Sequence, residues 1–145
     1  MAITQEELKR FEVAMRRLRL RSVRIMGRAL SRFDLTVSQH TLLFCLFHQE
    51  KCKMSELARE LGITMGAATS IVDRLIKAGL VKRERSTEDR RVVLVSLSKK
   101  GRRMMEEVHK VTLELMANLL SRLSAREREA FLSAYEKMSE EIESL

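Results

Sequence analysis

The sequence contains no proline, only five glycines and only two cysteines in 145 residues. Because no proline-rich or glycine-rich linker and no internal repeat divides it, residues 1–145 are predicted to form one cooperative unit. The two cysteines, Cys45 and Cys52, are too few for the disulfide framework of a secreted domain. The longest apolar run, Leu42 to Phe47, has six residues, far short of a transmembrane helix. We therefore expect a cytoplasmic protein without a membrane partner.

Sequence motifs of common enzymes are also absent. The chain has no glycine-rich phosphate-binding loop, no Gly-x-Ser-x-Gly turn and no His-Glu-x-x-His zinc motif, and it has only three histidines to serve as bases. Cys45, His48 and Cys52 follow one another at steps of three and four residues, but Cys52 is expected beyond the end of their helix. We therefore expect no enzyme, no metal site and no cofactor. A zinc site and a cysteine redox switch stay open as alternatives.

The sequence has an excess of positive charge. It contains 28 lysines and arginines against 20 acidic residues, a net charge of +8 and a pI of about 10.0. This balance predicts a polyanionic partner, although it suits RNA or an anionic membrane as well as DNA.

Seven arginines and no acidic residue lie within 16–32. Those at positions 17, 21, 24, 28 and 32 share a helix face, so they could follow DNA phosphates or line a pocket for an anionic effector. The interpretation that we favour is a solvated or intersubunit face that pairs with acids such as Glu106, Glu107 and Glu114. The seven are Arg16, Arg17, Arg19, Arg21, Arg24, Arg28 and Arg32.

Helical patterns cover most of the chain. A capping box of Thr4 and Glu7 predicts the start of a long first helix, in which apolar residues recur at heptad-like spacing as far as Ala29. Further helices are predicted over 38–49 and 98–120. A second capping box, Ser124 with Glu127, opens a last helix whose apolar side is expected to face inward. This side carries Ala130, Phe131, Ala134, Tyr135, Met138 and Ile142.

The segment 57–71 has the spacing of a helix-turn-helix. Ala58 is small enough for two helices to cross closely, and Gly62 can adopt the left-handed conformation that ends the first of them. Their shared core is expected to come from Leu57, Leu61, Ile63, Ala68 and Ile71. The outward positions of the second helix form a candidate surface for the DNA major groove. They are Met65, Gly66, Thr69, Ser70 and Asp73.

After Gly79 the pattern changes from helical to extended. The ranges 81–86 and 92–97 are β-prone, and the polar stretch 87–91 between them predicts a β-hairpin wing. Beside a recognition helix, such a wing can reach the minor groove, where the negative potential attracts arginine. The expected fold is therefore mainly α with a small β-hairpin wing. The hairpin carries the cations Lys82, Arg83, Arg85, Arg90 and Arg91.

Together these motifs resemble the winged helix-turn-helix of the multiple antibiotic resistance regulator (MarR) family. The resemblance implies a DNA-binding region over 35–97, flanked by dimerisation helices over 4–32 and 98–145. It further implies a homodimeric transcription factor, usually a repressor, that binds a palindromic operator in double-stranded DNA and responds to a small molecule, an oxidant or a metal. The residues that carry it are Leu35-Thr36, Gln39, Leu57-Ala58, Gly62-Ile63, Val72-Asp73-Arg74-Leu75, Gly79-Leu80-Val81, Asp89-Arg90-Arg91 and Val95-Ser96-Leu97-Ser98.

Position by position, the resemblance assigns 65–70 to base reading, Arg74 to a DNA-backbone contact and Arg91 to the wing contact, with Asp89 orienting Arg91. The reading face lacks the Arg, Asn or Gln that make bidentate base contacts, so direct readout is expected to be modest and groove shape to contribute. A merely solvated face at 69–70 is the alternative. The predicted DNA-binding set is Thr64, Met65, Gly66, Ala68, Thr69, Ser70, Arg74, Arg85, Asp89, Arg90 and Arg91.

The flanking helices carry more apolar surface than a monomer of this length would cover, which predicts the homodimer. The residues are Leu20, Val23 and Leu30 on the first helix, with Leu113, Leu115, Met116, Leu119 and Leu120.

The resemblance also places a candidate effector pocket between the first two helices and the penultimate helix, where flexible methionines suit an adaptable site. His40 is interpreted as a packed histidine rather than a ligand contact. Two other functions stay open, a sequence-tolerant architectural DNA-binding protein and a winged-helix protein-interaction adaptor. The pocket residues are Met26, His40, Phe44, Phe47 and Met104.

Overall fold

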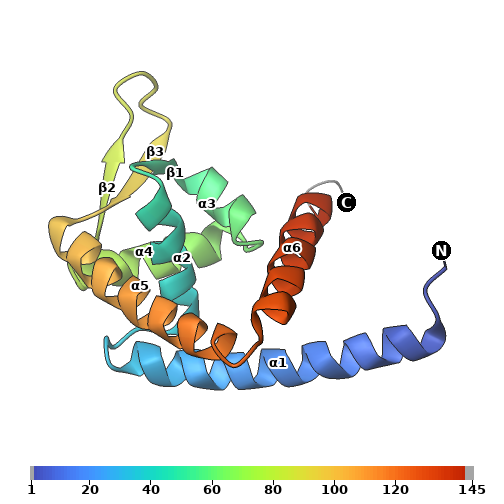
Figure 1. The fold of residues 1–145 in the computed structure, drawn as a ribbon. Coiled ribbons are helices and arrows are strands. Elements are labelled where there is room, and N and C mark those ends of the chain that lie inside the picture. The colour runs from blue at the N-terminus through green and yellow to red at the C-terminus, as the bar shows by residue number, and fades with distance from the viewer. Residues whose placement is uncertain (1, 143–145) are drawn as a thin grey trace. The chain divides into compact units, whose positions relative to one another are not determined.

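The computed structural model describes residues 2–142. It is mainly helical with a small antiparallel sheet, as predicted (Figure 1). The chain divides into two compact units, Met1–His109 and Lys110–Leu145, so the single cooperative unit stays a prediction. The elements are α1 (Gln5–Ser31), α2 (Val37–His48), β1 (Cys52–Lys53), α3 (Met54–Glu60), α4 (Met65–Lys77), β2 (Val81–Arg85), β3 (Val93–Leu97), α5 (Lys99–Leu120) and α6 (Ala125–Ile142).

The helix starts follow the capping signals in the sequence. Hydrogen bonds from the Thr4 backbone N–H and hydroxyl to the Glu7 carboxylate begin α1 and lower the pKa of Glu7. The box of Ser124 and Glu127 begins α6 in the same way, and the hydroxyl and N–H of Ser124 lower the pKa of Glu127. The predicted starts of these two helices are therefore confirmed.

The helix-turn-helix consists of α3 and α4. Leu57 and Ala58 of α3 are buried, and Gly62 adopts a φ of 62° in the turn between the helices. The Ile63 N–H then bonds the Ala58 carbonyl at 3.0 Å, which closes the end of α3. Gly79, with a φ of 74°, ends α4 similarly. Both turns are as predicted.

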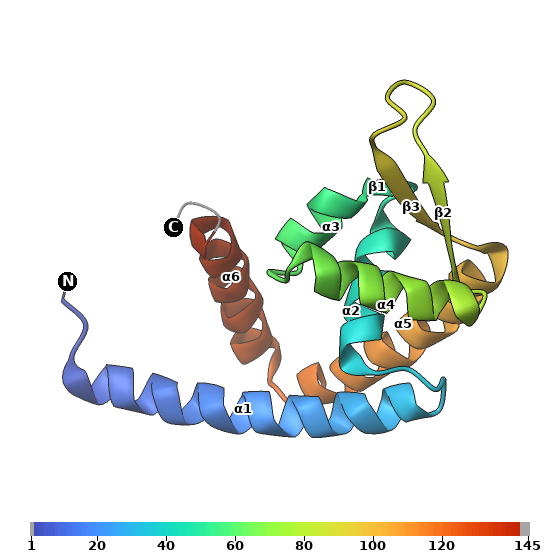
Figure 2. The same ribbon diagram turned by 180° about the vertical axis from the view of Figure 1, so that it is seen from behind.

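The wing is the hairpin of β2 and β3, which belongs to a three-stranded antiparallel sheet in the order β1-β3-β2. Strands β2 and β3 pair from Val81 opposite Leu97 to Arg85 opposite Val93. The two-residue strand β1, which sequence analysis did not predict, pairs Cys52 with Val95. In both views the β2–β3 hairpin projects away from α1 within the unit Met1–His109 (Figures 1 and 2).

The core of the unit Met1–His109 lies beneath the helix-turn-helix and the sheet. It collects buried side chains from the end of α1, from α2, α3 and α4, from both long strands and from the start of α5. Leu30 is 1% exposed and belongs to this core, which corrects its assignment to a dimer-forming apolar line. Its largest fully buried side chains are Leu30, Leu42, Leu43, Leu46, Leu57, Leu75, Val72, Val95, Met105 and Val108.

The unit Lys110–Leu145 differs from the prediction. No described residue of α6 is buried, so the expectation that its apolar side faces inward was wrong. A unit this short has too little chain to cover such a stripe. None of the described helices is long and apolar enough to cross a membrane. The apolar side chains left uncovered on α6 include Phe131, Leu132, Tyr135, Met138 and Ile142.

Candidate nucleic-acid interface

Helix α4 presents most of the predicted base-reading residues at its N-terminal half. The Thr64 hydroxyl caps the helix by accepting a hydrogen bond from the Ala67 N–H at 3.2 Å. The buried side of the helix is fixed by Val72 and Leu75, both with no exposed surface. The opposite side of α4 therefore faces solvent. The predicted DNA-binding residues that are exposed on this side are Met65, Gly66, Ser70 and Arg74.

Two members of the predicted set differ from the expectation. Ala68 has no exposed surface and packs in the core, so its assignment to DNA contact is corrected. Complete burial leaves no part of this small side chain for a base. Thr69 is half-buried, and its hydroxyl donates a hydrogen bond to the Met65 carbonyl at 2.8 Å. The Thr69 oxygen therefore keeps acceptor capacity, while its proton is already engaged.

At the wing tip, Asp89 holds Arg91. The Arg91 backbone N–H donates to Asp89 Oδ1 at 3.0 Å, and the guanidinium donates from Nε to Oδ1 at 3.2 Å and from Nη2 to Oδ2 at 3.4 Å. These bonds lower the pKa of Asp89, the backbone bond most strongly. The Arg91 side chain is nevertheless 91% exposed. It is thus oriented and still free to bind an anion.

Arg85 has a structural role in the same hairpin. Its Nη1 donates to the Arg90 carbonyl at 3.2 Å and so braces the turn that carries Asp89 and Arg91. The Arg90 side chain is exposed. The wing therefore places Arg90 and Arg91 at its tip and Arg85 behind them.

One contact between the recognition helix and the wing was missed by sequence analysis. Arg83 Nη1 of β2 lies 3.1 Å from Asp73 Oδ1 of α4. The two residues are ten positions apart, and their pairing follows from the packing of α4 against β2. No local sequence pattern indicates such a pair. It ties the wing to the helix that would read bases.

The two elements share one concave surface. A hollow of about 300 Å³ is lined by Met65 and Thr69 of α4 together with Arg83 and Arg91 of the wing. The structure thus brings residues from both predicted DNA-reading elements to one place. It adds residues of the β1–α3 junction that sequence analysis did not include. The remaining lining residues are Lys53, Met54, Ser55, Val92 and Val93.

Neutralising Asp73 tests the Arg83 contact. We expect Asp73→Asn to lower the preference for operator over scrambled DNA by about 1.4- to fivefold, because an exposed ion pair contributes about 0.2–1 kcal/mol. The measurement is a competition titration with both duplexes. Glu84→Gln removes the same charge from an ion pair with Lys51 and serves as the control. An unchanged preference in Asp73→Asn would remove the ion pair from the interface.

The candidate effector residues are partly brought together. The three histidines lie around Phe44 and Phe47, with the His40 and Phe44 ring centroids 6.0 Å apart and those of Phe47 and His109 5.6 Å apart. The Arg102 guanidinium carbon lies 5.9 Å from the Phe47 centroid. Burial lowers the pKa of His40, as for a packed histidine. Met26 and Met104 are half-buried against the core.

The cysteines show no sign of reactivity. Burial raises the pKa of the Cys45 and Cys52 thiols, which disfavours the thiolate needed for redox chemistry. Among residues 2–142 no group of three or more His, Cys, Asp or Glu side chains is placed to hold a metal ion.

Comparison with known proteins identifies the fold. The family description "MarR family" matches residues 35–93. The multiple antibiotic resistance protein MarR of Escherichia coli is 34% identical over 106 residues, which cover 72% of this chain and 73% of that protein. A MarR family protein from Bacillus stearothermophilus has a solved structure with a TM-score of 0.89 and 26% identity, covering 97% of this chain and 99% of that one.

A further solved structure includes DNA. A cysteine-to-serine mutant of E. coli MarR complexed with operator DNA aligns with a TM-score of 0.76 and 26% identity, over 94% of this chain and 99% of that chain. The helix-turn-helix, strand β2 and the tip of the wing lie within residues 35–93, the region that the family description matches, and β3 begins at its end. The chain therefore belongs to the MarR family and is a DNA-binding transcriptional regulator, not an enzyme.

Proposed function

We propose that this regulator is a homodimeric repressor that binds a palindromic operator through α4 and the wing. The observation that carries the proposal is the hollow shared by α4 and the wing, with an exposed Arg91 held by Asp89 beside it. A helix of this kind enters the major groove, while a wing arginine binds in the adjacent minor groove. The proposed contact set comprises Thr64, Met65, Gly66, Thr69, Ser70, Arg74, Arg85, Asp89, Arg90 and Arg91.

The proposed dimer is supported by apolar surface on α1. This stripe is interrupted only by small residues and shows the heptad-like spacing of a helix packed on another helix. A two-fold dimer would present two recognition helices about 34 Å apart, one turn of B-DNA, and would therefore select a palindromic site. Its members, between 45% and 56% exposed, are Leu8, Phe11, Met15, Leu18 and Ile25.

Effector control is supported by the cluster around Phe44 and Phe47, where aromatic rings meet histidine and Arg102. A solved structure of BpsR from Bordetella bronchiseptica, 26% identical with a TM-score of 0.72, is described as regulated in DNA binding by 6-hydroxynicotinic acid. For this chain we propose a small-molecule effector at Met26, His40, Phe44, Phe47 and Met104. We place the protein in the cytoplasm, where its DNA would be.

Selection from a random duplex library tests the proposed specificity. We expect the enriched sites to share a two-fold symmetric motif. Thr69→Val should change the preferred base at one or two positions in each half-site, because valine keeps the shape of threonine but removes its acceptor oxygen. Ser121→Ala, which also removes a hydroxyl that donates to a nearby backbone carbonyl, that of Asn118, is the control. An unchanged motif in Thr69→Val would refute a base-reading role for Thr69.

The second candidate is a sequence-tolerant architectural protein. It is favoured by the absence of Arg, Asn and Gln from the outward face of α4 between Met65 and Ser70. In that case the library would yield no common motif, although binding would remain strong at low salt.

A further inference from the structure

The first helix carries a strip of positive charge that lies outside the proposed operator contact set. We name it the arginine face. All of its side chains are exposed, and they span about 22 Å along the helix at a rise of 1.5 Å per residue. It consists of Arg17, Arg21, Arg24, Arg28 and Arg32.

The arginine face has no acidic partner in the described part of its own unit. None of its guanidinium groups forms an ion pair within residues 2–109, and the favoured pairing with Glu106 or Glu107 is not found there. Between Arg16 and Arg32 the chain holds neither an acid nor a lysine. Like charges at this density repel one another, so the strip is most stable with an external anion beside it.

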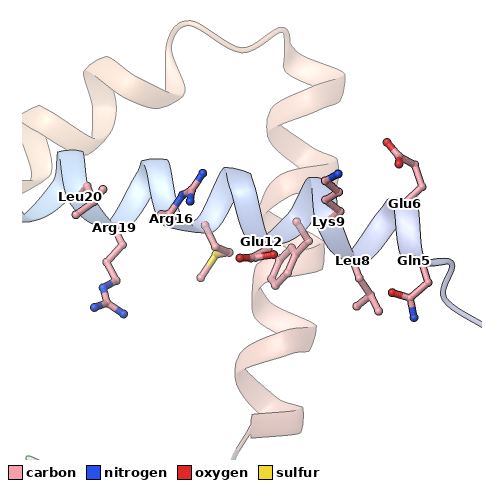
Figure 3. Close-up of a pocket in the computed structure, with 10 residues that line it drawn as sticks. Gln5, Glu6, Leu8, Lys9, Glu12, Arg16, Arg19 and Leu20 are labelled. Carbon is pink, nitrogen blue, oxygen red and sulfur yellow. The ribbon is translucent and has the colours of Figure 1, made fainter.

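Helix geometry separates the arginine face from the apolar stripe of α1. At 3.6 residues per turn, the strip of Arg17, Arg21 and Arg24 lies roughly 100° around the helix from that of Phe11 and Leu18. A second copy that packs on Phe11 and Leu18 would leave Arg17 and Arg24 in solvent. Figure 3 shows the first part of α1, where the acids Glu6 and Glu12 occur together with Lys9 and Arg16, so this part of the helix carries charge of both signs.

We propose that the arginine face binds the phosphate backbone of duplex DNA, at a site separate from α4 and the wing. Planar guanidinium groups bind phosphate oxygens in pairs, which favours arginine over lysine for this contact. Successive arginines at steps of three and four residues give a row of such contacts along one groove edge. The hairpin projects away from α1 in both views, so the two surfaces can hold different duplex segments (Figures 1 and 2). This inference rests on the proposed DNA-binding function and extends it to bridging of DNA.

The test neutralises three arginines in the full-length protein. The variant is R17Q/R21Q/R24Q, since glutamine keeps the helix propensity of arginine. The matched control, R122Q/R126Q/K137Q, removes three positive charges from exposed residues at the α5–α6 junction and on α6. Circular dichroism checks that α1 remains helical. If it does not, Arg21→Gln alone is measured, with an expected slope change of about 0.9.

The readout is the affinity for scrambled duplex at several salt concentrations. We expect R17Q/R21Q/R24Q to reduce the slope of log K against log salt by about 2 to 3 and to weaken binding at low salt at least about tenfold. The control should change the slope by less than about one. In a second assay, wild-type protein on bead-bound duplex should capture a fluorescent second duplex, and the α1 variant should not.

Three results would overturn this proposal. The first is that R17Q/R21Q/R24Q shows the same slope of log K against log salt as the wild type. Another is a weakened dimer in sedimentation, which would indicate pairing with acids across subunits. The third is binding to phosphatidylserine vesicles that depends on these arginines while duplex binding does not. Failure of the proposed repressor function can be told apart from failure of this proposal. The protein would then show no preference for operator DNA, but the wild type and R17Q/R21Q/R24Q would still differ in salt slope on scrambled DNA.

Discussion

Arg91→Ala is expected to weaken operator binding by about 1–3 kcal/mol and to reduce its salt dependence by about one released counterion. The Arg91 side chain is almost fully exposed, yet Asp89 accepts hydrogen bonds from its Nε and Nη2 atoms. Binding therefore costs little additional side-chain conformational entropy. Because the pKa of Asp89 is lowered, this carboxylate stays charged around neutral pH and keeps holding Arg91. The measurement is an operator titration by fluorescence anisotropy.

Two controls make the Arg91 result specific. Arg122→Ala removes an equal charge from an exposed position outside the wing and should leave operator affinity within about twofold. Sedimentation of Arg91→Ala should give the same dimer as the wild type, because the wing tip lies outside the apolar stripes. An affinity equal to that of the wild type would remove Arg91 from the interface.

Gly101→Ala is expected to destabilise the fold by about 3 kcal/mol, because a methyl group has no space at this position. An added Cβ would lie 2.0 Å from the Leu80 carbonyl oxygen and 2.9 Å from its carbon. Leu80 cannot move easily, since it is 3% exposed and its carbonyl accepts a hydrogen bond from the Ser98 N–H. The Gly101 N–H is also bound to the Ser98 hydroxyl at 2.9 Å. Denaturant unfolding monitored by circular dichroism measures the loss.

Gly27→Ala is the matched control for that experiment. It lies inside α1, and an added Cβ there would meet no atom within 4 Å. Alanine should therefore stabilise the helix by about 0.5–1 kcal/mol through its higher helix propensity. If Gly101→Ala unfolded at the same denaturant concentration as the wild type, the close packing of α5 on the turn after α4 would be wrong.

The parts of the fold that sequence predicted are those with local signals. The capping boxes at Thr4 and Ser124, and the left-handed glycines at 62 and 79, each depend on a few neighbouring residues. The family motifs likewise indicated the Asp89–Arg91 pair, whose members are two positions apart. Such features follow from short-range chemistry.

What sequence could not predict depends on contacts between distant segments. Strand β1 has two residues and exists only because β3 lies beside it, and the Asp73–Arg83 ion pair needs the finished packing of α4 on β2. The sequence predicts Ala68 both in the core and in the DNA contact, because a small residue at the start of a recognition helix is compatible with either position. Its complete burial places it in the core.

We propose that this MarR family member recognises a specific operator as a dimer. The most direct measurement is fluorescence anisotropy with duplex from the DNA just upstream of its own gene and with a scrambled duplex, at several salt concentrations. We expect a preference of about a thousandfold or more for the upstream DNA, with two chains bound per site. Equal and steeply salt-dependent binding to both duplexes would contradict it.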